Sequence, residues 1–369
     1  MHRVQKLLKQ FPDGAALITS PKNRYYYSGF TGTEAALLLT DSECYIFTDS
    51  RYHIQARQQA ADFILVDSAQ KTPSELINEL KIRHIGFEEE NMTVQEYNRL
   101  TGKLEHAVIE GISPLINQQR KIKDETEISH IRTAAAIADR AFSYIINEIR
   151  PGRTEKELAL KLEFFMRGQG AEGLSFESIF ASGARSAMPH GTASGKVIER
   201  GDFVTMDYGC VFQGYCSDMT RTVVVGKATG QQKNIYSTVL AAQKAALAAV
   251  RPGAKAADVD KTARDIISAA GYGENFGHSL GHSLGLDVHE FPSLSPKSEE
   301  SLAAGMLVTD EPGVYIEGFG TRPGDHCLVA EVGGKVVGAA WCRIMEDYGH
   351  IDNDTPSLAI SLLPEYRGK

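Results

Sequence analysis

The chain has few of the features that mark secreted, membrane-spanning or nucleic-acid-binding proteins. Its five cysteines are scattered and odd in number, with neither a disulfide framework nor paired CxxC metal spacing, which predicts a reduced, cytoplasmic protein. The opening stretch MHRVQKLLKQFPDG is amphipathic and lacks the apolar core of a signal peptide. The most apolar later run, VLAAQKAALAAV, is interrupted by Gln243 and Lys244, so we expect no membrane-spanning segment.

Basic residues are also scarce relative to acidic ones. Lys and Arg number 39 against 47 Asp and Glu, a formal net charge of -8, which argues against a general nucleic-acid binder. The balance is compatible with a small-molecule or peptide substrate. The hydrophobic fraction of 42% is typical of a globular protein, and 369 residues exceed the usual size of one core. We therefore expect two domains.

The first domain is predicted over residues 1–120. Strand-like and helix-like pieces alternate there: AALLLT and CYIFTD predict a hairpin, and PSELINELKI predicts a helix that begins near Pro73. This alternation is typical of an α/β domain.

A different pattern follows residue 120. Apolar residues at three-and-four spacing predict a helix over 128–149, and Thr154 with Glu157 forms the capping box of the next helix. Strand-like sequence follows in SFESIFASG, DFVTMDYGCVF and YCSDMTRTVVVG, and then two more helices. Strands return at MLVTDEPGVYIE and HCLVAEVGG. This mixture predicts an α+β domain over 121–337, followed by a divergent tail at 338–369.

Two aspartates stand in strand-like sequence of the second domain. If residues 213–214 form a two-residue turn, Asp207 lies opposite Thr220, and Asp218 is its diagonal neighbour on the same face. Two such carboxylates repel each other and are costly to desolvate. A bound dication offsets both costs, so the pair indicates a metal site.

A plainer interpretation of these aspartates stays open. Each carboxylate could face solvent, or Asp218 could pair with Arg221 or Arg185. The Met, Tyr, Val and Phe residues around Asp207 favour the buried, metal-binding interpretation.

A histidine strengthens the metal hypothesis. His282 lies in GHSLGHSLG, where small residues permit close approach, and Glu311 follows later in TDEPG. Asp, Asp, His and Glu form an oxygen-rich set that suits a hard or borderline metal such as Mn, Co or Zn. By spacing alone, His190 and His278 are typical of turn residues.

The ordered motifs of the second domain match a known family. The blocks SGARSAMPHG, GDFVTMDYG, GYCSDMTRT, GHSLGHSLGLDVHE and DEPGVYI resemble those of the Xaa-Pro peptidases, the aminopeptidase P and prolidase group of the M24 metallopeptidases. The segments RYYYSGFTGTEAALLLT and FTDSRYHIQA look like the first domain of the same family. The resemblance runs from about residue 20 to about 335. It implies a creatinase-like α/β domain followed by an α+β pita-bread catalytic domain.

The resemblance implies a two-metal hydrolase in which a metal-activated water attacks the peptide bond. Asp207 would hold one metal, Asp218 would bridge both, and His282 with Glu311 would complete the other. The two divalent ions would be manganese, with cobalt or zinc as alternatives.

The resemblance also assigns roles around the metals. His190, His289 and Glu311 would be catalytic: His190 would stabilise the tetrahedral intermediate, His289 would lie near the scissile bond, and Glu311 would also shuttle protons. Arg322 and His278 would bind substrate.

The chain departs from the family at one ligand. The family has a bridging Glu in a segment like GVRIEDD, whereas this chain reads GTRPGDHCLV, which puts Gly324 at that position. Asp325 is the candidate replacement, one methylene shorter and one residue displaced. Without that bridge, the metal held by Asp207 and Asp218 should bind weakly.

Two hypotheses follow. The first is a metallopeptidase that cleaves between an N-terminal residue and proline, as an aminopeptidase or a dipeptidase. Its partners would be proline-containing peptides and a second copy of the chain, with no nucleic acid and no membrane. The second is an impaired or non-peptidase pita-bread protein, with one metal or none, or a creatinase-like hydrolase of another C–N bond.

Overall fold

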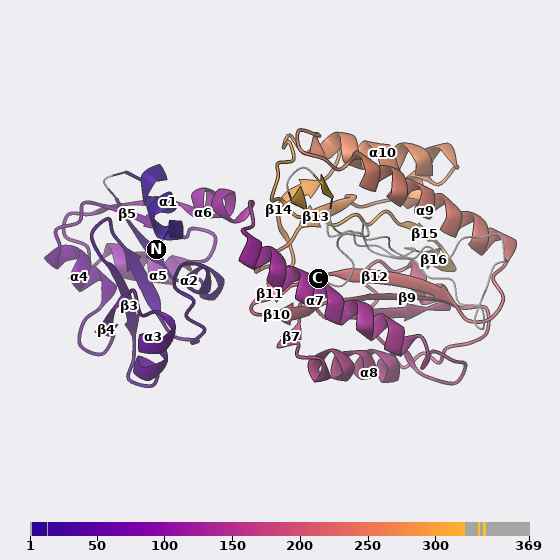
Figure 1. Ribbon diagram of the computed structural model, residues 1–369, viewed down its shortest axis with the longest axis horizontal. Coiled ribbons are helices and arrows are strands. Elements are labelled where there is room, and N and C mark those ends of the chain that lie inside the picture. The colour runs from indigo at the N-terminus through magenta and orange to yellow at the C-terminus, as the bar shows by residue number, and fades with distance from the viewer. Residues whose placement is uncertain (1, 13, 322–330, 333–334, 337–369) are drawn as a thin grey trace. The chain divides into compact units, whose positions relative to one another are not determined.

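A computed structural model describes residues 2–12, 14–321, 331–332 and 335–336 of the chain. The chain divides into two compact units, Met1–Arg120 and Lys121–Lys369 (Figure 1). Each unit has its own hydrophobic core residues, which include one cluster in the first unit and two in the second. The predicted residues Arg322, Gly324 and Asp325 and the predicted tail lie outside the described residues.

The first unit is built on a six-stranded mixed sheet in the order β4-β3-β2-β1-β5-β6. Its strands are β1 (Ala15–Ile18), β2 (Ala36–Leu39), β3 (Cys44–Thr48), β4 (Ile64–Asp67), β5 (His84–Phe87) and β6 (Val108–Gly111). Its helices are α1 (His2–Gln10), α2 (Pro21–Ser28), α3 (His53–Gln59), α4 (Pro73–Glu79), α5 (Val94–Thr101) and α6 (Ser113–Arg120). The predicted hairpin is present as β2 and β3, paired antiparallel with Leu39 opposite Cys44.

The second unit mixes long helices with short strands. Its helices and 3-10 turns are α7 (Glu125–Ile145), α8 (Glu155–Gly168), η1 (Gly183–Ala187), α9 (Gly230–Ala249), α10 (Ala256–Ala269) and η2 (Gly273–Asn275). Its strands are β7 (Gly173–Leu174), β8 (Ile179–Ser182), β9 (Phe203–Tyr208), β10 (Cys210–Phe212), β11 (Tyr215–Cys216), β12 (Met219–Val224), β13 (Gly281–Ser283), β14 (Glu290–Leu294), β15 (Val314–Ile316), β16 (Phe319–Thr321), β17 (Glu331–Val332) and β18 (Lys335–Val336).

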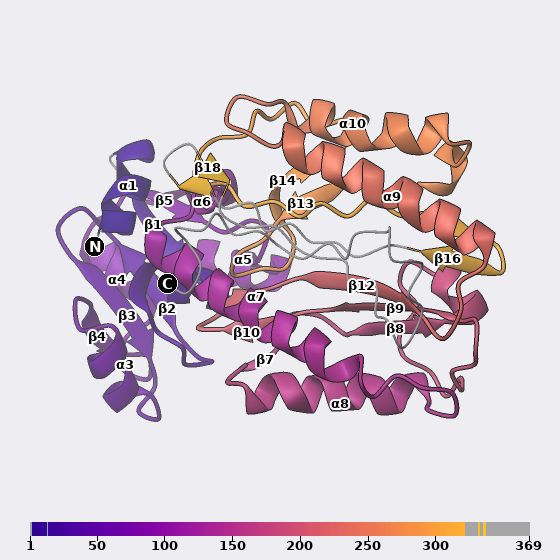
Figure 2. The same cartoon turned by 45° about the vertical axis from the view of Figure 1, so that its right-hand side comes forward.

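Two helical pairs enclose the strands of the second unit. Helices α7 and α8 cover one side of the strands, and helices α9 and α10 cover the other side, as both Figure 1 and Figure 2 show. One core joins α7 and α8 to β8, β9 and β12, and includes Phe142, Leu162 and Phe180. A second core joins α9 and α10 to β14, β15 and Leu280, the residue before β13, and includes Val239 and Ile267. The strands between the two cores are therefore held from both sides.

The register predicted for the two aspartates is confirmed. Asp207 on β9 pairs with Thr220 on β12, and the same register continues through β10 and β11 to the turn. Gln213 and Gly214 at the turn have φ values of 48° and 74°, the positive angles that a two-residue hairpin turn requires. Turn chemistry and strand alternation thus place Asp207 and Asp218 on one face.

One strand prediction was too long. Of the residues predicted as strand over 306–317, only Val314–Ile316 forms one, as β15. The segment before it makes separate hydrogen bonds with β13 and its preceding residue: Thr309 N–H donates to the His282 carbonyl and Glu311 N–H to the Leu280 carbonyl, both at 2.7 Å. These two bonds, from alternate residues, hold the segment beside β13 without forming a regular strand.

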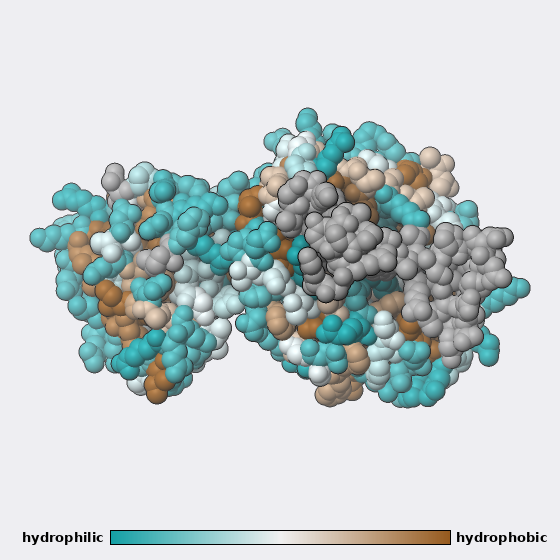
Figure 3. Space-filling model, viewed as in Figure 1, coloured by the Kyte–Doolittle hydropathy of each residue, from teal (hydrophilic) through white to brown (hydrophobic). Residues whose placement is uncertain are grey.

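The face seen in Figure 3 is mostly hydrophilic on both units, with hydrophobic residues in small, separate spots. Within the described ranges, no helix is long and apolar enough to cross a membrane.

Candidate metal centre

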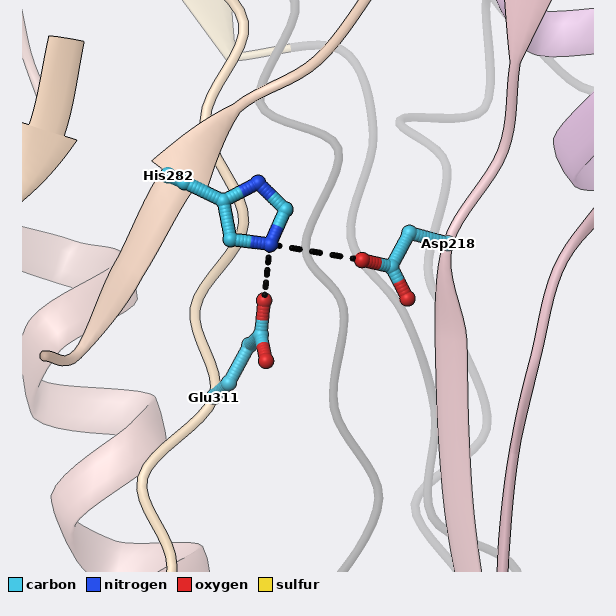
Figure 4. A group of neighbouring side chains, drawn as sticks. All are labelled: Asp218, His282 and Glu311. Atoms are coloured by element: carbon cyan, nitrogen blue, oxygen red, sulfur yellow. Dashed lines mark ion pairs between the residues drawn. The ribbon is translucent and has the colours of Figure 1, made fainter. Parts of the chain in front are cut away.

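Three predicted ligands converge in the second unit. His282 on β13 points its Nε2 between two carboxylates, 3.0 Å from Glu311 Oε1 and 3.4 Å from Asp218 Oδ2 (Figure 4). One potential ligand atom from each residue lies within 4.8 Å of the other two. Side chains from three separate segments therefore meet at one point.

Local hydrogen bonds orient the imidazole. His282 Nδ1 lies 3.0 Å from the Ser283 carbonyl, and because a carbonyl only accepts, Nδ1 carries the proton. When the ring is neutral, Nε2 is then the nitrogen with a lone pair, and it is the one that faces the two carboxylates. Metal-binding histidines commonly have this arrangement, in which the second nitrogen donates to a backbone carbonyl.

The charge of the group fits a divalent cation. Asp207 and Asp218 are 5% exposed and Glu311 is 7% exposed, so three carboxylates are largely withdrawn from water in one pocket. Burial alone would lower the pKa of His282, but the attraction of Glu311 and the hydrogen bonds with Asp218 and Glu311 raise it well above its usual value. A dication would replace the proton held in this negative environment. The oxygen-rich donor set with one imidazole suits Mn, Co or Zn.

The ligand group lies in a cavity of about 730 Å³. All seven predicted site residues that the structure describes line it: His190, Asp207, Asp218, His278, His282, His289 and Glu311. These residues span more than a hundred positions of the sequence, and the fold brings them to one surface.

The remaining histidines surround the ligand group. The His289 ring lies against the His282 ring, with centroids 4.4 Å apart. Burial, followed by the neighbouring His282 charge, lowers the pKa of His289. The neutral form of His289 is therefore favoured, and neutral imidazole both accepts and donates a hydrogen bond.

The two arginines offered as partners for Asp218 each lie beside another carboxylate. Arg185 lies 3.2 Å from Glu155, and Arg221 lies 3.6 Å from Asp139. Each guanidinium is thus engaged by a carboxylate outside the candidate site.

The polar residues that line the cavity include Tyr315 and Glu177, which sequence reasoning missed. His278 Nδ1 donates to the Ser279 carbonyl at 2.7 Å, so Nε2 of the neutral ring accepts from the Tyr315 hydroxyl at 3.2 Å. The block DEPGVYI contained Tyr315, but alternation along a strand could not say which partner its hydroxyl meets. Glu177 stands in SFESIF without a motif to single it out.

Two family profiles match the chain. The profile described as metallopeptidase family M24 matches residues 129–331, more than half of the chain. The creatinase/prolidase N-terminal domain profile matches residues 1–122.

Individual proteins match over nearly the whole chain. A protein named Xaa-Pro dipeptidase from Pyrococcus horikoshii is 40% identical, covering 87% of this chain and 91% of that protein. The solved structure titled Xaa-Pro dipeptidase from Bacillus anthracis is 41% identical with a TM-score of 0.87, covering 91% of this chain and 96% of its own. The solved X-Pro aminopeptidase from Thermotoga maritima is 40% identical with a TM-score of 0.83, covering 88% and 94%.

Proposed function

This chain belongs to metallopeptidase family M24, and from that membership we propose that it hydrolyses the peptide bond between an N-terminal residue and a following proline. The observation that carries the proposal is the convergence of Asp218, His282 and Glu311 in one cavity of a chain that matches the family throughout. The same matches confirm the predicted fold class, a creatinase-like α/β domain followed by an α+β pita-bread catalytic domain.

Asp218, His282 and Glu311 would hold one divalent ion, and Asp207 and Asp218 would contribute to a second. A divalent ion bound there polarises the scissile carbonyl and makes a water nucleophilic near neutral pH. The buried position of the carboxylates supports these roles, because a low-dielectric site strengthens their hold on a cation. Asp325, predicted as a further ligand, lies outside the described residues.

The protein's own groups handle substrate and protons around the ions. Glu311 takes the proton from the attacking water and passes it toward the leaving proline nitrogen. His289, whose pKa is lowered chiefly by burial, is neutral and donates a hydrogen bond near the scissile bond. His190 lines the same cavity and stabilises the tetrahedral intermediate, and His278 contacts the substrate together with Arg322.

The family resemblance and the site residues also support proposals on the native metal, the cellular setting, the assembly and the domain limits. We propose manganese as the native metal, with cobalt or zinc as substitutes, because the donor set is oxygen-rich with one imidazole. The buried, free thiols Cys44, Cys210 and Cys216 support a reduced, cytoplasmic setting. Homodimer assembly is proposed on the family resemblance. The domain limits 1–120 and 121–337 are likewise proposed, with 338–369 as a tail.

The function is tested by release of the N-terminal residue from Met-Pro and Met-Pro-Ala, with added Mn²⁺ and with EDTA. Turnover that EDTA abolishes supports the proposal, and the ratio of the two rates separates a dipeptidase from an aminopeptidase. Folded protein that cleaves neither peptide with Mn²⁺, Co²⁺ or Zn²⁺ overturns it in favour of an impaired member, with Gly324 as the suspected cause.

A further inference from the structure

Helix α10 carries an ion pair with a buried carboxylate, and this pair faces the loop leading into β13. Asp260 is fully buried, and Arg264, one turn later, has a side chain only 26% exposed. The guanidinium contacts both carboxylate oxygens, with Nε 2.8 Å from Oδ2 and Nη2 2.8 Å from Oδ1. This two-pronged geometry fixes both side chains relative to each other.

The pair also binds the backbone of the neighbouring loop. Arg264 donates from Nη1 to the Phe276 carbonyl and from Nη2 to the His278 carbonyl, both at 2.9 Å. The Arg264 guanidinium also lies 4.3 Å from the centre of the Phe276 ring. Asp260 Oδ1 accepts the Leu280 N–H at 3.0 Å. The pair thus holds three backbone groups within five consecutive residues.

Leu280 connects the pair to the ligand group. Its N–H donates to Asp260, while its carbonyl accepts the Glu311 N–H at 2.7 Å. His282 follows two residues later on β13, and its carbonyl accepts the Thr309 N–H. The buried residue Leu280 therefore links the backbone of both His282 and Glu311 to helix α10.

We propose that the Asp260–Arg264 pair is a positioning element of the metal site, which sets the spacing between His282 and Glu311 and the placement of His278. A buried ion pair is weak evidence for stability, since apolar residues of similar volume often stabilise equally well. Its directed hydrogen bonds, by contrast, select one backbone geometry for the loop. The proposal rests on the metal site of the proposed function, and it concerns how this chain maintains that site.

The test compares this pair with a matched pair on the same helix. Lys261 and Asp265 form an ion pair with the same four-residue spacing, but their side chains are 68% and 63% exposed. Asp260→Asn, Arg264→Gln and Arg264→Lys are compared with Lys261→Gln and Asp265→Asn. The affinity of the metal-free protein for Mn²⁺ is measured by calorimetry, and kcat and KM are measured with Met-Pro.

Asp260→Asn and Arg264→Gln are expected to weaken Mn²⁺ binding by about tenfold, the lower end of the effect of removing a direct partner of a metal ligand, because the pair acts through the backbone of Leu280. Arg264→Lys keeps the charge without the planar fork, so its loss is intermediate. The two surface variants change Mn²⁺ affinity less than about twofold, as an exposed pair contributes little.

Wild-type Mn²⁺ affinity and wild-type kcat/KM in folded Asp260→Asn and Arg264→Gln would overturn the proposal. If these two fail to fold, unchanged Mn²⁺ affinity in Arg264→Lys overturns it as well. The Mn²⁺ measurement needs no peptide. A wild-type protein that binds Mn²⁺ but cleaves no Xaa-Pro peptide therefore contradicts the peptidase function and leaves the positioning test valid.

Discussion

Gly281→Ala tests why small residues surround His282. A methyl group on Gly281 would lie 2.0 Å from the Thr309 carbonyl oxygen, a distance that real side chains essentially never show. The two backbones would have to separate by roughly 1 Å, and overpacking of this kind costs about 1–3 kcal/mol. The separation would also stretch the hydrogen bonds between Thr309 and His282, at 2.7 and 2.9 Å, and move His282 away from Glu311.

We expect Gly281→Ala to lower the free energy of unfolding by about 2–4 kcal/mol, counting the clash and about 1 kcal/mol for weakened hydrogen bonds. Mn²⁺ affinity should fall at least about tenfold, because the ligand spacing changes. Urea unfolding and calorimetry measure the two effects. Gly277→Ala is the matched control, since a methyl there meets nothing within 4 Å. Wild-type stability and Mn²⁺ affinity in Gly281→Ala would refute the close-packing explanation.

Three further substitutions probe the second domain. Thr154→Ala removes the observed capping box with Glu157 and should destabilise α8 by about 1 kcal/mol, seen as faster hydrogen exchange in its first turn; unchanged exchange contradicts this. Glu155→Gln removes the charge of a fully buried carboxylate that binds Ser182, Arg185 and Ser194, which flank His190 in the chain. The substitution therefore weakens the hydrogen bonds that hold this loop. It should lower kcat/KM for Met-Pro roughly tenfold while Mn²⁺ affinity is retained, and equal kcat/KM would show that the loop needs no such anchor. Glu177→Gln removes a cavity carboxylate outside the ligand group and should reduce the kcat/KM ratio of Lys-Pro to Met-Pro by about two- to fivefold; an unchanged ratio excludes a role in substrate choice.

Local signals were sufficient for the hairpin that carries the aspartates. The Gln213–Gly214 turn and the alternation of the strands set the register, so the pairing of Asp207 with Thr220 could be predicted without any relative. The helix that follows Thr154 was predictable for the same reason, because a capping box lies within one turn.

Contacts between distant segments were not predictable from local patterns. The i,i+4 spacing of Asp260 and Arg264 suggests a pair on α10, but nothing in that spacing indicates that its hydrogen bonds go to the loop before β13. The strand predicted over 306–317 was too long for a similar reason, because an apolar pattern does not show which backbone groups before Val314 find partners on a neighbouring strand. The expected roles of His190, His278 and His289 came from the family resemblance, and spacing alone left His190 and His278 as turn residues.

The most direct test of the metal-dependent Xaa-Pro peptidase is proline release from Met-Pro by the wild-type protein and His282→Ala. Each is assayed after EDTA treatment and again after Mn²⁺ is restored. The wild-type protein should regain turnover with Mn²⁺, and His282→Ala should remain inactive at the same Mn²⁺ concentration. Turnover by the wild-type protein in EDTA, or equal turnover by His282→Ala, would contradict catalysis at the Asp218–His282–Glu311 site.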